Sequence, residues 1–408
     1  MEYGPVSADM TLYQDLLTYR SGVYQHKTDQ SIGLLAVKII GWGVENNQKY
    51  WLCVNSWNSE WGDKDFSMKL LLAVFLGLLA AVSSSPVKSL EQNFVVYSAE
   101  LVKKINSMNT TWKAGPNFAG ENAASVLDRL STPGLSREKA PKAPIITHDR
   151  AGAPPTEFDA RTKWPNCPSI GRVYDQGRCN AAWALAAVGA MNDRHCITYP
   201  GLHWNFSAED ALTCNPPNQA LDNNGCAAGF TLFAWMYWVQ QGLVSGGGYQ
   251  TPNGCRPYPY KPCDHYEKGT YGPCQAKPDS TVCNKTCVAG YPVPYEADKR
   301  KGSLYYNVGY TEADIQNEIM TYGPASVDMD LYEDLLTYRS GVYHHKSKNL
   351  LGNLAVKVIG WGVENNQKYW LCVNSWNSEW GDKGTFKILR GTFECNFEVN
   401  VRAGRMYK

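Results

Sequence analysis

The stretch that decides the fold reads DQGRCNAAWALAAVGAMND, residues 175–193, and it has a partner in VNSWNSEWG, residues 373–381. Apolar residues recur at spacings near three and four over 181–193, which predicts a helix, and the same pattern over 231–241 predicts a second one. Alternating runs at 357–360 and 368–373 predict strands. Helices first and strands later predict an α+β protein with two subdomains.

The amino-acid composition limits the classes of protein to which this chain can belong. The chain has 408 residues, and 39 Lys and Arg balance 38 Asp and Glu, so no basic surface for nucleic acid is expected. A hydrophobic share of 44% excludes a disordered chain. Ten of the 13 cysteines fall between Cys167 and Cys287. That crowding favours an oxidising compartment.

A long internal repeat sets the domain organisation. Residues 1–65 match residues 320–384 without a gap, with about 50 identical positions, and Gly41–Lys64 is the same string as Gly360–Lys383. We interpret residues 1–67 as a copied fragment, introduced by gene fusion or by an error in the gene model. The alternative is a real domain, but a quarter of a fold is not expected to bury a core of its own.

The sequence that follows predicts a secreted precursor. Residues 68–85 carry one Lys, an apolar run of about 13 residues and then small residues, which is the pattern of a signal peptide. That run is too short to cross a membrane as a helix. Residues 86–152 are polar and end in a stretch rich in Pro and Lys, which indicates a pro-segment. The mature domain is then expected to be residues 153–408.

The two motifs resemble those of papain-like cysteine proteases. The segment 175–184 resembles the family's Q-G-x-C-G-S-C-W, and the segment 374–381 resembles N-S-W-x-x-x-W-G. Residues 109–118 (NTTWKAGPNF) resemble the pro-segment signature of cathepsin B, and residues 255–274 resemble its occluding loop. The resemblance implies a helical left half, a right half like a β-barrel, and a substrate cleft between them.

The catalytic pair of that family is missing here. The position of the nucleophilic Cys is Ala182, and the position of the His is Leu354, within Gly352-Asn353-Leu354-Ala355. By resemblance, Gln176 keeps the oxyanion-hole position and Asn374 the position that orients the His. The copied fragment also has a leucine, Leu35, at the His position. We therefore expect a catalytically degenerate member of the family.

The cleft implied by the resemblance has also changed. Its residues are Trp183, Ala228, Gly229, His265, Tyr266, Trp376 and Asn400. Of these, Ala228 replaces a Gly, Tyr266 a second loop His, and Asn400 an acidic residue of the specificity pocket.

In the family, two side-chain contacts, here called ties, hold the occluding loop against the rest of the protein. Only one of them is expected to be kept in this chain. Asp175 and His265, which pin the loop in the family, are both present. A second tie is expected to be broken, because Tyr271 stands where an Arg would face Glu379.

The resemblance also implies five disulfides, and short motifs mark three glycosylation sites at Asn109, Asn205 and Asn284. No cofactor and no metal are expected, because no residues have zinc-ligand spacing. Cys372, two residues before Asn374, is expected to be a buried apolar Cys, while His265, His344 and His345 are expected at the surface rather than as metal ligands. The implied disulfides are Cys167–Cys196, Cys179–Cys226, Cys214–Cys283, Cys255–Cys287 and Cys263–Cys274.

These observations favour a secreted or lysosomal pseudoprotease. It would act as a monomer that binds peptides or cystatin-like protease inhibitors, without nucleic acid or membrane partners. One alternative is an active cysteine-type endopeptidase whose nucleophile has moved, with Cys372 the only candidate near the old site. The other is a decaying gene product with no function.

Overall fold

The protein is described from a computed structural model, in which the chain forms two units, Met1–Leu90 and Glu91–Lys408. Among the described residues, no helix has the length and apolar character needed to cross a membrane. The structure describes residues 6–13, 15–16, 19, 21–26, 31–46, 48–54, 67–71, 99–118, 121, 123–130, 143–148, 153–202, 204–215, 225–252, 254–265, 269–276, 278 and 282–407.

Helices dominate the first half of the mature region. The predicted helices are confirmed as α4 (Ala182–Thr198) and α6 (Thr231–Gln240). Every residue of α4 from Ala182 to Cys196 is buried, and its many alanines let neighbouring elements pack closely against it. The other helices are α3 (Ala160–Lys163), α5 (Ala208–Thr213), α7 (Tyr295–Asp298) and α8 (Glu312–Tyr322).

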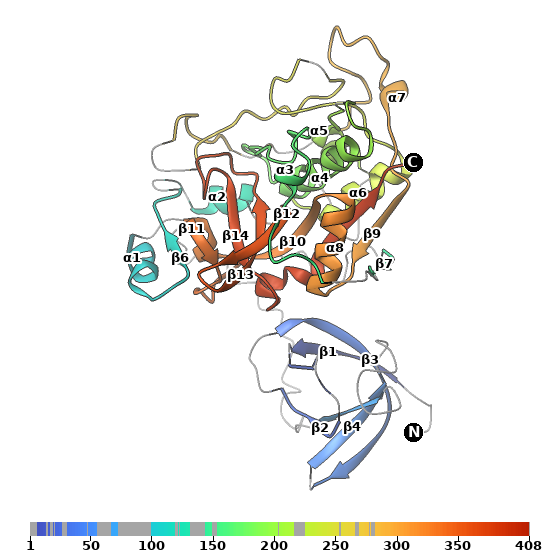
Figure 1. The fold of residues 1–408 in the computed structure, drawn as a ribbon, viewed down its shortest axis with the longest axis vertical. Coiled ribbons are helices and arrows are strands. Elements are labelled where there is room, and N and C mark those ends of the chain that lie inside the picture. Colours follow the sequence, from blue (N-terminus) through green and yellow to red (C-terminus); the bar gives the residue numbers. More distant parts are fainter. Residues whose placement is uncertain are drawn as a thin grey trace, which may run out of the picture. The chain divides into compact units, whose positions relative to one another are not determined.

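Strands dominate the second half and form a ten-stranded sheet in the order β6-β11-β14-β13-β12-β10-β15-β9-β7, with β8 paired to β12. Figure 1 shows the strands from β9 onward in orange and red beside the green helices, with β6 and β7 in blue-green, and this arrangement confirms the α+β fold with two halves. The strands of the mature region are β8 (Phe158–Asp159), β9 (Leu304–Val308), β10 (Ala325–Tyr332), β11 (Tyr338–Tyr343), β12 (Leu350–Glu364), β13 (Gln367–Val373), β14 (Thr385–Leu389) and β15 (Val401–Arg405).

The region expected as a pro-segment adds two strands to this sheet. Strand β6 (Trp112–Ala114) pairs antiparallel with β11, and β7 (Ile145–Ile146) pairs parallel with β9. Helices α1 (Ala99–Ser107) and α2 (Ala123–Leu130) belong to the same region. The pro-segment is therefore packed as part of the C-terminal unit.

The N-terminal unit repeats the hairpin of the C-terminal sheet. Its strands run in the order β1-β3-β4-β5-β2. In β3, Leu35 pairs with Met10 just as Leu354 pairs with Met329 in β12. The strands are β1 (Val6–Tyr13), β2 (Val23–Tyr24), β3 (Ser31–Glu45), β4 (Gln48–Val54) and β5 (Ser67–Leu71).

One expectation about this unit needs correction. It does bury a cluster of its own, because long strands that pair with each other cover part of one face. The cluster consists of Leu16, Tyr19, Tyr24, Leu35, Val37 and Cys53. Strand β5 includes Met68–Leu71, the start of the expected signal peptide, whose remaining residues lie outside the described ones. The boundaries at residues 67, 85 and 152 remain predictions.

The structure forms the five disulfides that the resemblance implied. A disulfide of this kind contributes about 2–4 kcal/mol of stability. The remaining cysteines, Cys53, Cys372 and Cys395, are free and buried.

Two buried ion pairs connect α4 to the second half. Lys357 of β12 lies 2.7 Å from Asp193 of α4. Arg194 lies 2.7 Å from Glu318 of α8 and donates to the main-chain oxygens of Pro324 and Gly404. These side chains are nearly solvent-free, so each charge depends on its partner.

We predict that Glu318→Gln destabilises the C-terminal unit by about 3–5 kcal/mol, because it leaves the Arg194 guanidinium buried without a counter-charge. Burial alone would raise the pKa of Glu318, but Arg194 and hydrogen bonds from His148 and Tyr306 outweigh it and lower the pKa from 4.5 to about 2. The stabilisation is thus complete above pH 4.5 and disappears as the pH falls through 2. Urea unfolding between pH 7 and pH 2 measures both effects.

As a control, Glu296→Gln removes an exposed partner of Lys299 and should leave the midpoint of urea unfolding unchanged. Equal midpoints for the two variants would contradict the prediction.

Candidate functional site

The two sequence motifs meet where the two halves join. Asp175 and Trp376 form an antiparallel β-bridge, and the main-chain nitrogen of Gln176 donates to the oxygen of Ser375 at 2.9 Å. The Cys179–Cys226 disulfide fixes the loop that leads into α4. Residues about 200 positions apart in the chain therefore form one site.

The side chain of Gln176 is held from both ends. Its Oε1 accepts a hydrogen bond from the Ser375 hydroxyl at 2.7 Å, and its Nε2 donates to the main-chain oxygen of Cys179 at 3.0 Å. Gln176 is fully buried. Its amide is therefore kept in one orientation beside the start of α4.

Ala182 is the first residue of α4, and Leu354 lies on β12 opposite Met329. Both are almost fully buried and belong to the same hydrophobic core. The N-terminus of a helix carries partial positive charge that would lower the pKa of a thiol placed there. A methyl group and an isobutyl group offer neither a nucleophile nor a proton to transfer.

Asn374 lies at the end of β13 with an unsatisfied amide. Its Oδ1 accepts from the main-chain nitrogen of Ser375 at 2.8 Å. Its Nδ2 is buried and has no hydrogen-bond partner in the part of the chain that the structure describes. A buried donor without an acceptor costs about 1–3 kcal/mol.

Cys372 does not provide a replacement nucleophile. It faces the core from β13 and is fully buried. Burial, with a smaller contribution from the carboxylate of Glu398, raises the pKa of this thiol well above its usual value. The thiol therefore stays protonated, as expected for a buried apolar Cys.

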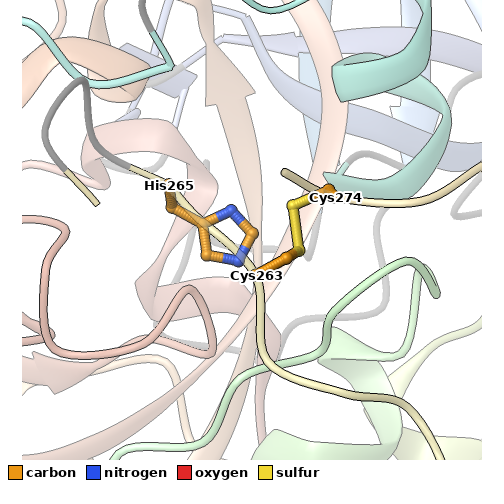
Figure 2. A group of neighbouring side chains, drawn as sticks. All are labelled: Cys263, His265 and Cys274. Carbon is orange, nitrogen blue, oxygen red and sulfur yellow. A yellow bond between two sulfur atoms is a disulfide. The ribbon is translucent and has the colours of Figure 1, made fainter. Parts of the chain in front are cut away.

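The segment around His265 forms a loop closed by a disulfide. Figure 2 shows the bond between Cys263 and Cys274 with the His265 ring beside it. His265 was expected at the surface, but it is fully buried and lies 3.1 Å from Asp175. Burial alone would raise the pKa of Asp175, but His265 and hydrogen bonds from Asn377 and the Gly177 nitrogen lower it. Tyr266 lies outside the described residues.

The second tie of this loop is present, which corrects the sequence-based expectation. Glu379 Oε1 accepts hydrogen bonds from the main-chain nitrogen and the hydroxyl of Thr270, at 2.7 and 2.8 Å. The main-chain nitrogen of the neighbouring Tyr271 donates a hydrogen bond to Asp264 Oδ1 instead. A hydroxyl one residue earlier thus takes the role expected of an Arg, which sequence alignment to a motif could not reveal.

The region expected as a pro-segment covers the site. Phe118 is buried with its ring edge-on to His265 and to Trp376, each at a centroid distance of 5.6 Å. Asn117 Nδ2 donates to the main-chain oxygens of Leu336 and Tyr338, at 2.9 Å each. Access to the site therefore requires displacement of residues 115–118.

The structure also describes the contacts of the other expected cleft residues. Trp183 lies so close to Gly229 that a Cβ there would sit 2.4 Å from the indole ring, so only glycine fits at 229. Ala228 is buried beside it. Asn400 is buried and its Nδ2 donates to the main-chain oxygen of Asn396, while its Oδ1 accepts from Arg402.

The three expected glycosylation sites differ in exposure. Asn109 and Asn284 are exposed, whereas Asn205 is half-buried and accepts a hydrogen bond from Arg172 at 2.8 Å. Their modification remains a prediction.

Comparisons with known proteins agree with this geometry. The model of the papain family cysteine proteases matches residues 1–70 and 154–404. A cathepsin B-like cysteine proteinase of Schistosoma japonicum is 41% identical over 75% of this chain and 90% of that protein. Cathepsin B-like cysteine proteinase 5 of Caenorhabditis elegans is 38% identical over 80% of this chain and 95% of its own length. The structure of procathepsin B S9 from Trypanosoma congolense is similar with a TM-score of 0.62 and 32% identity, over 76% of this chain and 98% of that one.

We predict that Asp175→Ala loosens the loop that carries His265. The carboxylate accepts hydrogen bonds from His265, Asn377 and the Cys263 nitrogen, and hydrogen bonds to a charged group contribute about 1.5–3 kcal/mol each. Amide exchange over residues 261–276 should become roughly ten- to a hundredfold faster. Glu379→Gln should have a smaller effect, because its contacts to Thr270 are exposed. Exchange in Asp175→Ala at the wild-type rate would show that the loop is held elsewhere.

Proposed function

We propose that this chain, which belongs to the papain family of cysteine proteases and is cathepsin B-like, has lost proteolytic activity and acts by binding. In this proposal it is a secreted or lysosomal pseudoprotease. Its ligands are peptides or cystatin-like protease inhibitors. The disulfides and the absence of a membrane-spanning helix among the described residues support an oxidising, non-membrane setting.

The observation that carries the proposal is the pair Ala182 and Leu354. Papain-like chemistry needs a thiolate at the start of the helix and an imidazole that pairs with it and later protonates the leaving amine. The first residue of α4 is Ala182, and the strand position that matches the family's His is Leu354. Loss of both groups removes every proton-transfer step.

The surroundings of this pair support the same conclusion. Gln176 is held in place, and the buried amide nitrogen of Asn374 has no hydrogen-bond partner among the described residues. This is the arrangement expected of a site that keeps its supporting residues but lacks the imidazole. In subtilisin, removal of catalytic residues lowers turnover by about a millionfold. We therefore expect no biologically useful hydrolysis.

An active peptidase that uses Cys372 is the rival function. Its thiol is fully buried and its pKa is raised by burial, so a thiolate there would be strongly disfavoured. No observation on the described residues favours this alternative.

We predict that the mature form neither cleaves dibasic fluorogenic peptides nor reacts with an epoxide that alkylates papain-like thiolates. Ala182→Cys alone should restore almost nothing, because the thiol lacks an imidazole partner. Ala182→Cys combined with Leu354→His should recover weak endopeptidase activity, since Gln176 and Asn374 support the restored pair.

The controls separate loss of chemistry from loss of structure. Far-UV circular dichroism and a count of free thiols should show that each variant is folded with five disulfides. Wild-type hydrolysis, or epoxide labelling at Cys372, would refute the proposal. A folded but inactive double variant would mean that the cleft has diverged beyond the catalytic pair.

We also predict that a cystatin binds the mature form without any covalent step. The loop around His265 must open for this, and two ties hold it, Asp175 with His265 and Glu379 with Thr270. A variant with Thr270→Val should bind several-fold more tightly, because apparent affinity rises with the population of the open loop. Calorimetry on protein with correct disulfides measures this. No binding by either form would exclude the inhibitor-binding role.

A further inference from the structure

A group of three potential metal ligands lies outside the candidate site. His345 follows strand β11, and Glu394 and Cys395 belong to a 3-10 helix, Glu394–Asn396. Nδ1 of His345, a carboxylate oxygen of Glu394 and Sγ of Cys395 all lie within 4.8 Å of one another. His345 was expected at the surface, but it is half-buried and pairs with Glu394 at 2.6 Å.

The spacing of the three atoms suits a small cation. Glu394 Oε1 lies 2.6 Å from His345 Nδ1 and 3.3 Å from Cys395 Sγ. In a tetrahedral zinc site with bonds of about 2.0–2.3 Å, ligand atoms are roughly 3.3–3.8 Å apart. The separation of Oε1 and Sγ already matches this range, whereas Oε1 and Nδ1 would have to move apart by about 0.7 Å to admit the ion.

Each ligand is held in place by its neighbours. The His345 ring stacks on Tyr332 with centroids 4.2 Å apart, and its main-chain nitrogen donates to Glu394 at 2.8 Å. Cys395 has a left-handed backbone with φ of 51°, which is uncommon for this residue and fixes the direction of its side chain. The ligands are thus oriented before any ion binds.

The surrounding charge and access favour a cation. The carboxylates of Asp330 and Asp334 act electrostatically on both His345 and Cys395. The side chain of His345 is 33% exposed, whereas that of Glu394 is 7% exposed. An ion can therefore enter past His345 and reach a buried, negatively charged interior.

We propose that His345, Glu394 and Cys395 bind a zinc ion or a similar divalent transition metal. One nitrogen, one oxygen and one sulfur ligand match the preferences of Zn²⁺, and a fourth position remains for water or another oxygen. The ion would clamp the turn that holds Asn400, because Asn396 accepts a hydrogen bond from that side chain. This inference does not depend on whether the chain is proteolytically active.

Two comparisons within the molecule sharpen the proposal. Cys263, His265 and Cys274 also lie together, as Figure 2 shows, but their sulfurs are joined in a disulfide and cannot act as thiolate ligands. In the N-terminal unit, His26 stacks on Tyr13 as His345 stacks on Tyr332. The copied sequence ends at residue 65, before the counterparts of Glu394 and Cys395, so no second site is expected there.

The test is a metal titration of the oxidised full-length chain after treatment with a chelator. Co²⁺ should bind at one equivalent with a thiolate-to-cobalt charge-transfer absorption, and Zn²⁺ should displace it. Cys395→Ser should abolish that absorption. His345→Gln should weaken binding roughly 100-fold or more.

Matched controls make the outcome decisive. Cys372→Ser removes another buried free thiol and should leave the spectrum unchanged. Glu394→Gln keeps the shape of the side chain, so it should retain the absorption but bind more weakly, even if Cys395→Ser proves unstable. Zn²⁺ should raise the melting temperature of the wild type and not of His345→Gln. The proposal is overturned by an absence of stoichiometric binding, by an absorption that survives in Cys395→Ser, or by its loss in Cys372→Ser.

Discussion

The structure depends on one helix that is buried on all sides. Helix α4 contacts both the neighbouring helices and the sheet, and two of its charged residues face charged partners rather than water. Asp193 meets Lys357 of β12, and Arg194 meets Glu318 of α8. Because buried charges are tolerated only when paired, these ion pairs fix the position of α4 relative to the sheet and to α8. The start of the helix, and with it the candidate site, is therefore positioned by interactions about three turns away.

In the proposed pseudoprotease, this arrangement would let the fold persist without proteolytic chemistry. The contacts that hold α4 involve neither Ala182 nor Leu354, and both of these side chains pack in the core. A reactive pair is commonly a cost to stability rather than a source of it. Replacement of such a pair by Ala and Leu would leave the disulfides, the ion pairs and the sheet register intact. In the proposed function, Asn374 would remain from the residues that support such a pair, and its buried Nδ2 has no hydrogen-bond partner among the described residues.

The helices and the disulfides could be predicted from the sequence, because they depend on local residue patterns or on family motifs. Helices α4 and α6 followed from apolar spacing, and the five disulfides followed from resemblance. Contacts between distant segments could not be predicted in this way. Thr270 bonds to Glu379, and His345 pairs with Glu394, 49 residues along the chain. Such pairs are decided by where loops come to lie in three dimensions, and no periodicity in the sequence records that.

The two copies of the repeated sequence show which structural features depend on local sequence and which depend on tertiary contacts. Gly41–Lys64 and Gly360–Lys383 are identical and form the same antiparallel register, with Trp42 opposite Trp51 and Trp361 opposite Trp370. Yet Trp42 is 62% exposed, whereas Trp361 is 1% exposed. In the C-terminal unit Phe158 stacks on Trp361 at 4.8 Å, and Pro155 accepts a hydrogen bond from its indole. The strand pairing is thus encoded locally, while burial of the aromatic face requires the segment before α3. The copy leaves the side chain of Trp42 exposed, and an exposed apolar face is a liability for a soluble domain. This exposure is consistent with the prediction, made from the sequence repeat, that residues 1–67 are a copied fragment.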